Sequence, residues 1–245
     1  NTTRGRNTDG EASQAFLEEV IVSAEKRLES VQDVSQAVTA ITSSEIETKN
    51  INSMVDLSAI VPGVTVAKNE GYKTIISIRG IGNETNQNAI AAPSVAFHLD
   101  GVFIASPFSL LTDFVDIDRI EVIRGPQGTL FGQNSTAGAI NVVTKAPSLD
   151  EESSSLSMSL GNYNMKKISS TFNVPISESV ATSFSFAGHK RDGYSFNTIL
   201  EQELDDANDF SFRNDWFFQL SDTSSLRIFG QYYDLDRNLS LIHIS

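Results

Sequence analysis

The chain has 245 residues and no cysteine, and its 18 basic and 31 acidic residues give a formal net charge of −13. No region carries the basic excess that binding to a nucleic-acid backbone requires, so that class of function is excluded. Without cysteine there is no disulfide framework, thiolate nucleophile or cysteine-based metal site, and no apolar run of ~18 residues predicts a transmembrane helix.

The N-terminal part begins with a polar tail and continues with a short segment of high β propensity. Residues 1–17 are rich in Thr, Asn and Gly and lack apolar periodicity, which predicts disorder. Residues 18–24 read EEVIVSA. An isolated strand next to a flexible tail has unpaired backbone groups and suits addition to another protein's sheet. An edge strand of the following domain is the alternative.

Residues 25–147 predict one small α+β domain. Ser44 is the expected N-cap of a first helix, with Glu47 completing a capping box, and a second helix is expected from Ser53 to Ile60, ended by Pro62-Gly63. Asp100-Gly101 lies between two β-prone runs and predicts a tight hairpin turn. The expected strands cover residues 37–41, 64–66, 75–78, 95–99, 102–104, 120–123 and 140–144.

From residue 148 onward, apolar side chains alternate with small hydroxyl and amide side chains. The pattern predicts five antiparallel strands of about ten residues, a length that spans a bilayer when the strand is tilted by ~45°. Short connections at 175–179 and 221–224 contrast with a long one at 189–208. This favours the start of a transmembrane β-barrel over a soluble β-sandwich. Five strands cannot close such a barrel, so we expect the remaining strands to lie outside this chain.

No residue pattern supports an enzyme, a cofactor or a metal site. The glycine loop at 125–132 is not followed by Gly-Lys-Ser/Thr, and His98, His189 and His243 are isolated. The acidic residues between 201 and 209 are expected to form a solvated loop. Asp116 and Asp118 are expected to share one exposed strand face. A hydrolase that uses a pair of carboxylates is kept as a third hypothesis.

Several motifs in combination resemble the TonB-dependent outer-membrane receptors, from the TonB box through the plug domain into the first barrel strands. The motifs are EEVIVSA, VQDVSQAVTAIT, DLSAIVPGV, ISIRGIG, FHLDGVFI and DRIEVIRGPQGTLFGQNSTAGAINVVTK. The resemblance covers residues 18 to about 236, nearly the whole chain. Ser35 stands where the family often has proline, and His98 where an aromatic or other hydrophobic residue is common.

The resemblance implies a fold, a function and a set of partners. The fold would be an α+β plug domain at 25–147, followed at 148–245 by the first strands of a 22-stranded barrel. The function would be energy-coupled import of a scarce nutrient, such as a ferric siderophore, across the outer membrane of a Gram-negative bacterium. TonB with its inner-membrane energising complex, the small-molecule ligand and membrane lipid would be the partners. A periplasmic or surface binding module without transport is the alternative.

The resemblance also implies three sets of functional residues. The TonB box at 18–24 would contact TonB mainly through its backbone, and a polar plug loop would face the ligand. Arg79 and Arg124 match plug arginines that pair with glutamates of the barrel wall. The expected TonB contacts are Glu19, Val20, Ile21, Val22, Ser23 and Ala24, and the expected ligand loop is Asn83, Glu84, Thr85, Asn86, Gln87 and Asn88.

Overall fold

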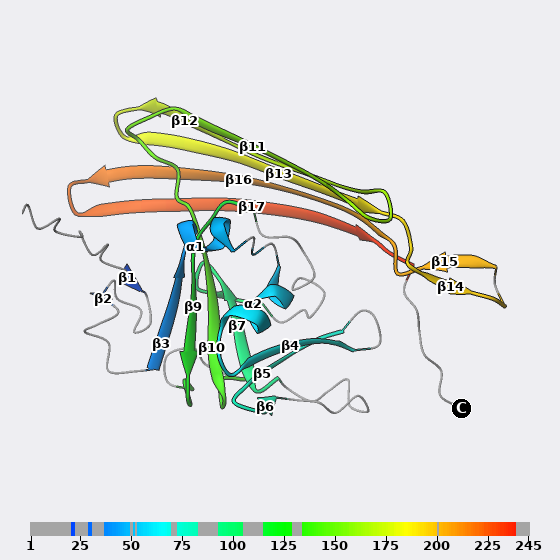
Figure 1. The fold of residues 1–245 in the computed structure, drawn as a ribbon. Coiled ribbons are helices and arrows are strands. Elements are labelled where there is room, and N and C mark those ends of the chain that lie inside the picture. Colours follow the sequence, from blue (N-terminus) through cyan, green and yellow to red (C-terminus); the bar gives the residue numbers. More distant parts are fainter. Residues whose placement is uncertain are drawn as a thin grey trace, which may run out of the picture.

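The computed structural model has an α+β N-terminal domain beneath one large, curved antiparallel sheet (Figure 1). It describes residues 21–22, 29–30, 37–49, 51, 53–69, 73–82, 93–104, 115–128, 134–199 and 201–238. Within these residues, no helix has the length and apolar character needed to cross a membrane. The large sheet lies over one end of the N-terminal domain (Figure 1).

A mixed five-stranded sheet forms the centre of the N-terminal domain. Its strands lie in the order β3 (Ala37–Thr42), β9 (Ile117–Arg124), β10 (Gly138–Thr144), β7 (Val95–Leu99) and β8 (Val102–Phe103). Only the β10–β7 pair is parallel. Ile120, Val122, Ile140 and Val142 are fully buried on β9 and β10. The expected core strands are thus confirmed, and they form the rigid base from which the β7–β8 turn projects.

Glycine opens β10 because the backbone of β9 passes too close for any side chain. Gly138 has a φ of 151°, and a Cβ atom built there would lie 2.3 Å from the carbonyl oxygen of Ile123. That separation is far below van der Waals contact, so only glycine fits. Close pairing of the two strands follows.

Two short helical segments cover one side of this sheet, and the first begins earlier than the sequence predicts. Helix α1 spans Ser43–Thr48, and its capping box is formed by Thr42 and Glu45. The expected N-cap at Ser44 with Glu47 is therefore wrong by two residues. The second segment, a 3₁₀ turn η1 (Met54–Asp56) followed by α2 (Leu57–Ile60), agrees with the predicted helix and ends before Pro62.

Two smaller sheets accompany the central one. One contains β4 (Val64–Asn69), β5 (Lys73–Ile78) and β6 (Ile81–Gly82), and the other pairs β1 (Ile21–Val22) with β2 (Glu29–Ser30). The Asp100-Gly101 hairpin between β7 and β8 is confirmed. Both turn residues have positive φ angles of 50° and 78°, as a type I′ turn requires.

The large sheet is a meander of long strands, which we call the wall sheet. It consists of β11 (Ser153–Gly161), β12 (Met165–Ser177), β13 (Val180–Arg191), β16 (Ala207–Ser221) and β17 (Ser224–Asp236), in that order. The sheet is open, with β11 and β17 at its edges. The predicted five antiparallel strands are confirmed. These strands are 9 to 15 residues long, compared with the expected length of about ten residues. A hairpin of β14 (Ser195–Asn197) and β15 (Gln202–Leu204) occupies the long connection.

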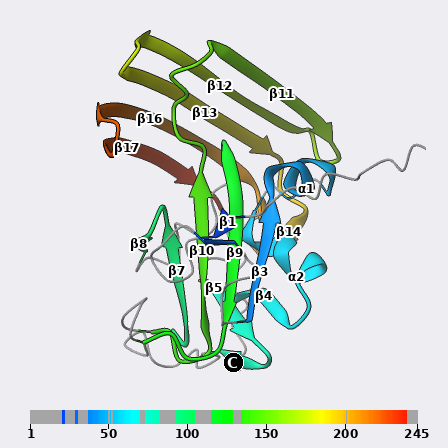
Figure 2. The same ribbon diagram turned by 90° about the vertical axis from the view of Figure 1, so that its left-hand side faces the viewer.

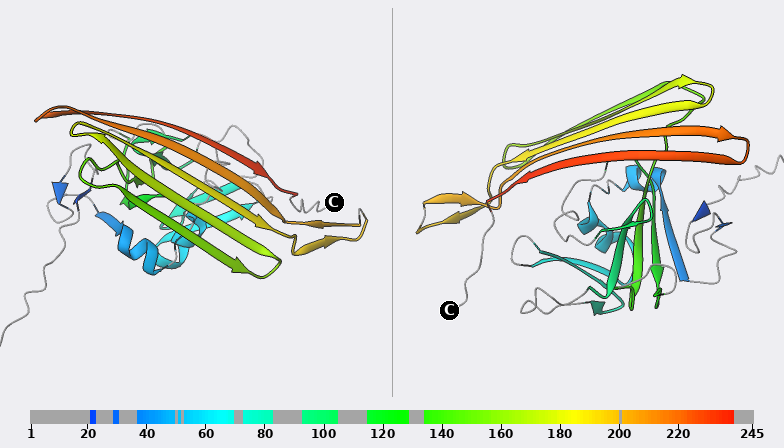
Figure 3. Two further views of the ribbon diagram at one scale, coloured as in Figure 1. Left: turned by 90° about the horizontal axis from the view of Figure 1, so that it is seen from above. Right: turned by 180° about the vertical axis from the view of Figure 1, so that it is seen from behind.

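The two faces of the wall sheet differ in chemistry and in what they contact. One face exposes large apolar side chains such as Leu160, Ile228 and Tyr232. The opposite face carries buried Ser185, Ser211 and Arg213 and lies toward the N-terminal domain. Figures 2 and 3 show β9 and β10 rising toward this covered face, and no second sheet packs on the wall within the described part of the chain. The sandwich alternative therefore does not describe this region.

Candidate functional site: a buried ion network between the two sheets

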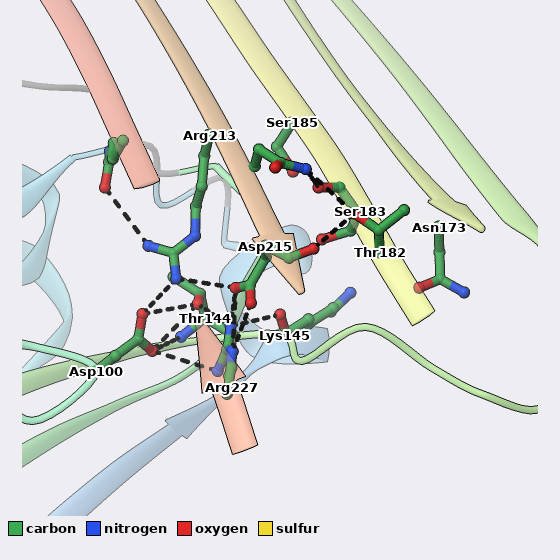
Figure 4. A network of polar contacts seen from close by, with 12 residues as sticks. Asp100, Thr144, Lys145, Asn173, Thr182, Ser183, Ser185, Arg213, Asp215 and Arg227 are labelled. Carbon is green, nitrogen blue, oxygen red and sulfur yellow. Dashed lines mark hydrogen bonds and ion pairs between the residues drawn. The ribbon is translucent and has the colours of Figure 1, made fainter. Parts of the chain in front are cut away.

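Charged side chains from both parts of the molecule converge where the β7–β8 turn and the end of β10 meet the wall sheet (Figure 4). Asp100 lies in the turn, and Thr144 is the last residue of β10. Arg213 and Asp215 lie two residues apart on the covered face of β16, and Arg227 lies on the same face of β17. We call these five residues the junction network.

Within the N-terminal domain, Thr144 holds the carboxylate of Asp100 in place. The backbone N–H of Thr144 donates to Oδ1 of Asp100 at 2.8 Å, and the Thr144 hydroxyl donates to Oδ2 at 2.9 Å. The turn geometry contributes as well, because Asp is among the few non-glycine residues that tolerate a positive φ. The carboxylate of Asp100 is therefore held in one orientation, toward the wall sheet.

Two arginines of the wall sheet complete the network. Nη2 of Arg213 lies 2.7 Å from Oδ2 of Asp100 and 3.1 Å from Oδ2 of Asp215. Nη2 of Arg227 lies 2.6 Å from Oδ2 of Asp215, and its Nη1 lies 3.8 Å from Oδ1 of Asp100. Each arginine therefore contacts one carboxylate of the N-terminal domain and one of the wall.

Arg227 also binds the chain where it leaves β10. Its Nη2 donates to the Thr144 hydroxyl at 2.7 Å and to the carbonyl oxygen of Lys145 at 2.9 Å. The guanidinium of Arg213 additionally stacks over the ring of Phe229, with its Cζ 4.1 Å from the ring centroid. The planar, multi-donor guanidinium is suited to such shared contacts, which a lysine would not reproduce.

The junction network is buried and electrically balanced. The side chains of Asp100, Arg213, Asp215 and Arg227 are 6%, 7%, 2% and 23% exposed, and two positive charges face two negative ones. Burying an ion pair is costly unless it is well hydrogen-bonded, and removal of one partner then costs about 3–5 kcal/mol. The network therefore ties the N-terminal domain to the wall sheet in one geometry.

A chain of hydrogen bonds continues from the network into the N-terminal domain. The backbone N–H of Gly101 donates to Oδ1 of Asn141 at 3.2 Å. Nδ2 of Asn141 donates to Oε2 of the fully buried Glu121 at 3.0 Å, and Arg119 donates to the other oxygen of Glu121 at 2.8 Å. The turn that carries Asp100 is therefore supported by a polar side chain in each of the two central strands.

A pocket of about 280 Å³ lies beside the network, between the two sheets. Phe97, Leu99 and Ile117 line it from the N-terminal domain. Ser211, Arg213 and Tyr233 line it from the wall sheet. The contact between the two parts near β7 and β16 therefore depends on the polar network rather than on continuous apolar packing.

Asp116 lies at the edge of this region and differs from expectation. It precedes β9 with a φ of 55°, and its backbone carbonyl accepts from Lys145 N–H at 2.8 Å. Burial raises the pKa of its carboxyl above the ordinary value, against the opposing effect of Lys145, Arg213 and Arg227. The expectation that Asp116 and Asp118 share an exposed strand face is wrong because Asp116 precedes β9 instead of lying on it, whereas Asp118 is half-exposed and pairs with Arg119.

The acidic stretch after residue 201 also differs from the expected solvated loop. Asp205 is buried, and the carbonyl oxygen of Asp205 accepts from Arg191. Asp209 lies within β16, where it pairs with Arg237 and lies 3.5 Å from Nδ1 of His189. Glu201 and Glu203 are exposed as expected, whereas Asp205 and Asp209 are not part of a solvated loop.

The arginines that the sequence singled out lie at another corner of the N-terminal domain. The backbone N–H of Arg79, which has a φ of 54°, donates to the carbonyl oxygen of Gly63 at 2.6 Å. Arg124 donates from Nη2 to the carbonyl oxygen of Pro62 at 3.4 Å. The fold thus brings both arginines to one turn. Within the described residues neither has an ion-pair partner, so their pairing stays a prediction.

The other predicted site residues are only partly described. Of the expected TonB contacts, Ile21 and Val22 form β1 and pair with Ser30 and Glu29. Glu19, Val20, Ser23 and Ala24 lie outside the described residues, as does the whole expected ligand loop from Asn83 to Asn88. Both assignments therefore stay predictions.

The fold and the network define a plug-like domain joined to a membrane-type sheet wall, and comparison with known proteins gives the family. Residues 30–139 match the model of the TonB-dependent Receptor Plug Domain. Residues 30–139 therefore belong to the plug domain family of the TonB-dependent receptors, and the fold is similar to that of the ferripyoverdine receptor of the outer membrane of Pseudomonas aeruginosa. This membership places the protein at the outer membrane of a Gram-negative bacterium.

Particular relatives illustrate the range of the family. The vitamin B12 transporter BtuB of Vibrio vulnificus strain YJ016 is 26% identical over 189 residues, which are 77% of this chain and 30% of that protein. The pesticin receptor of Yersinia pestis is 29% identical over 57% of this chain and 20% of its own length. The chain spans 24% to 33% of the length of the BtuB relatives that it matches.

Solved structures agree with this fold. The ferric yersiniabactin uptake receptor FyuA of Yersinia pestis superposes with a TM-score of 0.71 at 20% identity, covering 81% of this chain and 31% of that receptor. The pyoverdine receptor FpvA of Pseudomonas aeruginosa superposes with a TM-score of 0.72 at 18% identity, covering 88% of this chain and 30% of that receptor. At these identities the likeness supports the fold alone.

Proposed function

We propose that the protein is an energy-coupled outer-membrane receptor that imports a scarce small-molecule nutrient, with a ferric siderophore as the preferred ligand class. The observation that carries this proposal is the buried ion network, which holds a plug domain against the polar face of a wall whose other face is apolar. A plug is useful only where the lumen behind a membrane wall must stay closed until a ligand arrives.

The relatives support import without fixing the ligand. Their names include a vitamin B12 transporter and ferric-pyoverdine and pesticin receptors. These names describe transport receptors rather than enzymes. Asp100 and Asp215 are the carboxylates that converge at the junction, and their oxygens are occupied by arginine and threonine donors. That arrangement supports an interlocking role and gives no support to the hydrolase hypothesis.

The proposed cycle begins with ligand binding on the outer side, with the loop from Asn83 to Asn88 as the proposed plug contact. TonB would then pair with residues 19–24 as an added strand and transmit force to the plug. We also propose that Arg79 and Arg124 pair with glutamates of the complete wall. Their shared position at the Pro62–Gly63 turn supports a common anchoring role.

Uptake by cells that carry the complete gene tests this proposal. Strains lacking their own receptors would be supplied separately with labelled ferric siderophores and with labelled cyanocobalamin. We expect accumulation of one ligand class that depends on tonB and on the proton gradient. Uptake at background level for both ligand classes would overturn the proposal of import.

A further inference from the structure

The junction network contains an asymmetry that concerns how a plug is held and released. Asp100 is its one carboxylate from the N-terminal domain, whereas Arg213, Asp215 and Arg227 all belong to the wall sheet. Both wall arginines contact both carboxylates. The wall therefore carries its own carboxylate next to the one that the plug inserts.

Asp215 is bound more extensively than a simple neighbour of the plug would need to be. Nε of Arg227 lies 3.0 Å from each of its two oxygens, Nη2 of Arg227 lies 2.6 Å from Oδ2, and Arg213 adds a contact at 3.1 Å. Every one of these bonds lies within the wall sheet. They do not require the plug, so they orient both arginines whether or not Asp100 is present.

Departure of the plug would therefore change the charge balance by one unit only. With Asp100 in place the network has two positive and two negative groups. Without Asp100, Asp215 still pairs with both arginines, and one positive charge is left uncompensated instead of two. Uncompensated buried charge is the main penalty for opening an ion pair, so the wall carboxylate limits the cost of release.

The plug side is built to present Asp100 at a fixed point. Asn141 accepts from the turn through Gly101 N–H and is itself oriented by Glu121, which is fully buried. Thr144 holds the carboxylate directly. The Asp100 carboxylate is thus held in place by the strands of the plug, and the two arginines are held in place by the wall. Such preorganisation on both sides lets the contact form again in the same geometry after the plug has moved.

We propose that Asp100 is a positioning residue that latches the plug to the wall through Arg213 and Arg227, and that Asp215 makes this latch reversible. The proposal rests on the proposed receptor function. In the closed receptor the four charges neutralise each other and seal the plug at β16 and β17. When the plug moves, Asp215 retains both arginines and keeps them ready to accept Asp100 again.

The first test measures leakage, because leakage does not depend on uptake. Asp100→Asn preserves size and suits the positive φ, but it removes the charge. Asp118→Asn is the matched control, since Asp118 is a half-exposed carboxylate on the same sheet whose ion pair is with Arg119, within the N-terminal domain. Each complete receptor would be purified and its conductance recorded in planar lipid bilayers. We expect open events to rise about tenfold or more for D100N and to match wild type for D118N.

A double-mutant cycle addresses the wall side and guards against simple loss of folding. Arg213→Gln should leak as D100N does, and the double variant should leak no more than either single variant, since both remove the same contact. Leakage of D100N equal to that of D118N would overturn the latch, as would effects of D100N and R213Q that multiply. If D100N fails to reach the membrane, equal conductance of R213Q and wild type overturns it.

Uptake measurements test reversibility and separate the two proposals. We expect Asp215→Asn to keep the closed conductance but to slow tonB-dependent uptake several-fold, because both arginines then lose their last carboxylate partner when Asp100 leaves. Uptake by D215N equal to wild type would overturn the role of Asp215. A wild type that imports no ligand while D100N leaks would remove the transport proposal and leave the latch standing.

Discussion

Asp116 shows how burial acts on one charged residue at the edge of the junction network. Its carboxyl has a raised pKa because desolvation outweighs the attraction of Lys145, Arg213 and Arg227. A group whose pKa is higher in the folded than in the unfolded state binds more protons when folded. The folded protein therefore gains stability as the pH falls through the folded pKa, and it carries a penalty above that pH.

We expect Asp116→Asn to raise the melting temperature at neutral pH. Asparagine tolerates the φ of 55° and keeps the backbone bond to Lys145, so only the buried charge is lost. The advantage should shrink as the pH falls toward the ordinary range of an aspartate. Melting curves in detergent across this pH range test it, with D118N as the control. A D116N advantage that stays constant with pH would contradict the assignment.

The residues of the junction network could be predicted only in part from the sequence. The Asp100-Gly101 turn is predictable from its dipeptide, but the partner of Asp100 lies 113 positions away. A signal existed in the wall strands, because Arg213, Asp215 and Arg227 fall on the polar side of alternating segments. Charged residues in membrane-spanning segments are functional candidates by default. Their pairing depends on how the wall lies over the plug, which no local pattern encodes.

Local elements were largely predictable, and the errors have local causes. The alternation of apolar residues gave the wall strands and the core strands β9 and β10 correctly. The start of α1 was misplaced because Thr42, Ser43 and Ser44 can all cap a helix. Strand β3 continues through Thr42, whose backbone is extended, so the helix begins directly after it. Pairing with β9 therefore decides which hydroxyl is the cap.

The capping box of α1 gives a prediction for this element. Thr42→Ala removes the hydroxyl that accepts from Glu45 N–H, and the loss should lower the free energy of unfolding by about 1 kcal/mol. Thr42→Ser keeps the oxygen and should remain close to wild type. Urea unfolding of the full chain in detergent measures both. A serine variant as unstable as the alanine variant would assign the effect to the methyl group instead.

The β7–β8 turn gives a second prediction at the scale of an element. Gly101 has a φ of 78°, and no heavy atom lies within 4 Å of a Cβ built there. Gly101→Ala should therefore destabilise through backbone strain alone, by about 1–2 kcal/mol. Gly101→Asn should cost less, because asparagine tolerates this region. Denaturant midpoints measure the stability of the two variants. An asparagine variant at least as unstable as the alanine variant would contradict the argument from backbone strain.

At the scale of the whole molecule, the proposed function requires the N-terminal segment to exchange one strand partner for another. Ile21 and Val22 pair with Ser30 and Glu29 in this structure, and that pairing is only two residues long. So short a hairpin has little stability of its own. The backbone of Ile21 and Val22 can therefore leave β2 and pair with an added strand of TonB, which is how the proposed function uses this segment.

Replacing Ile21 by proline tests that use in the complete receptor. Proline lacks the backbone N–H and fixes φ, so it disrupts strand pairing with any partner. We expect energised uptake to be abolished while ligand binding at the cell surface stays at the wild-type level, because the substitution leaves the wall strands and the proposed ligand loop unchanged. Ile21→Thr keeps the N–H and the β-branched shape and should transport normally. Whole-cell uptake and binding of the same labelled ligand measure both effects. Equal uptake by I21P and wild type would remove strand addition from the mechanism.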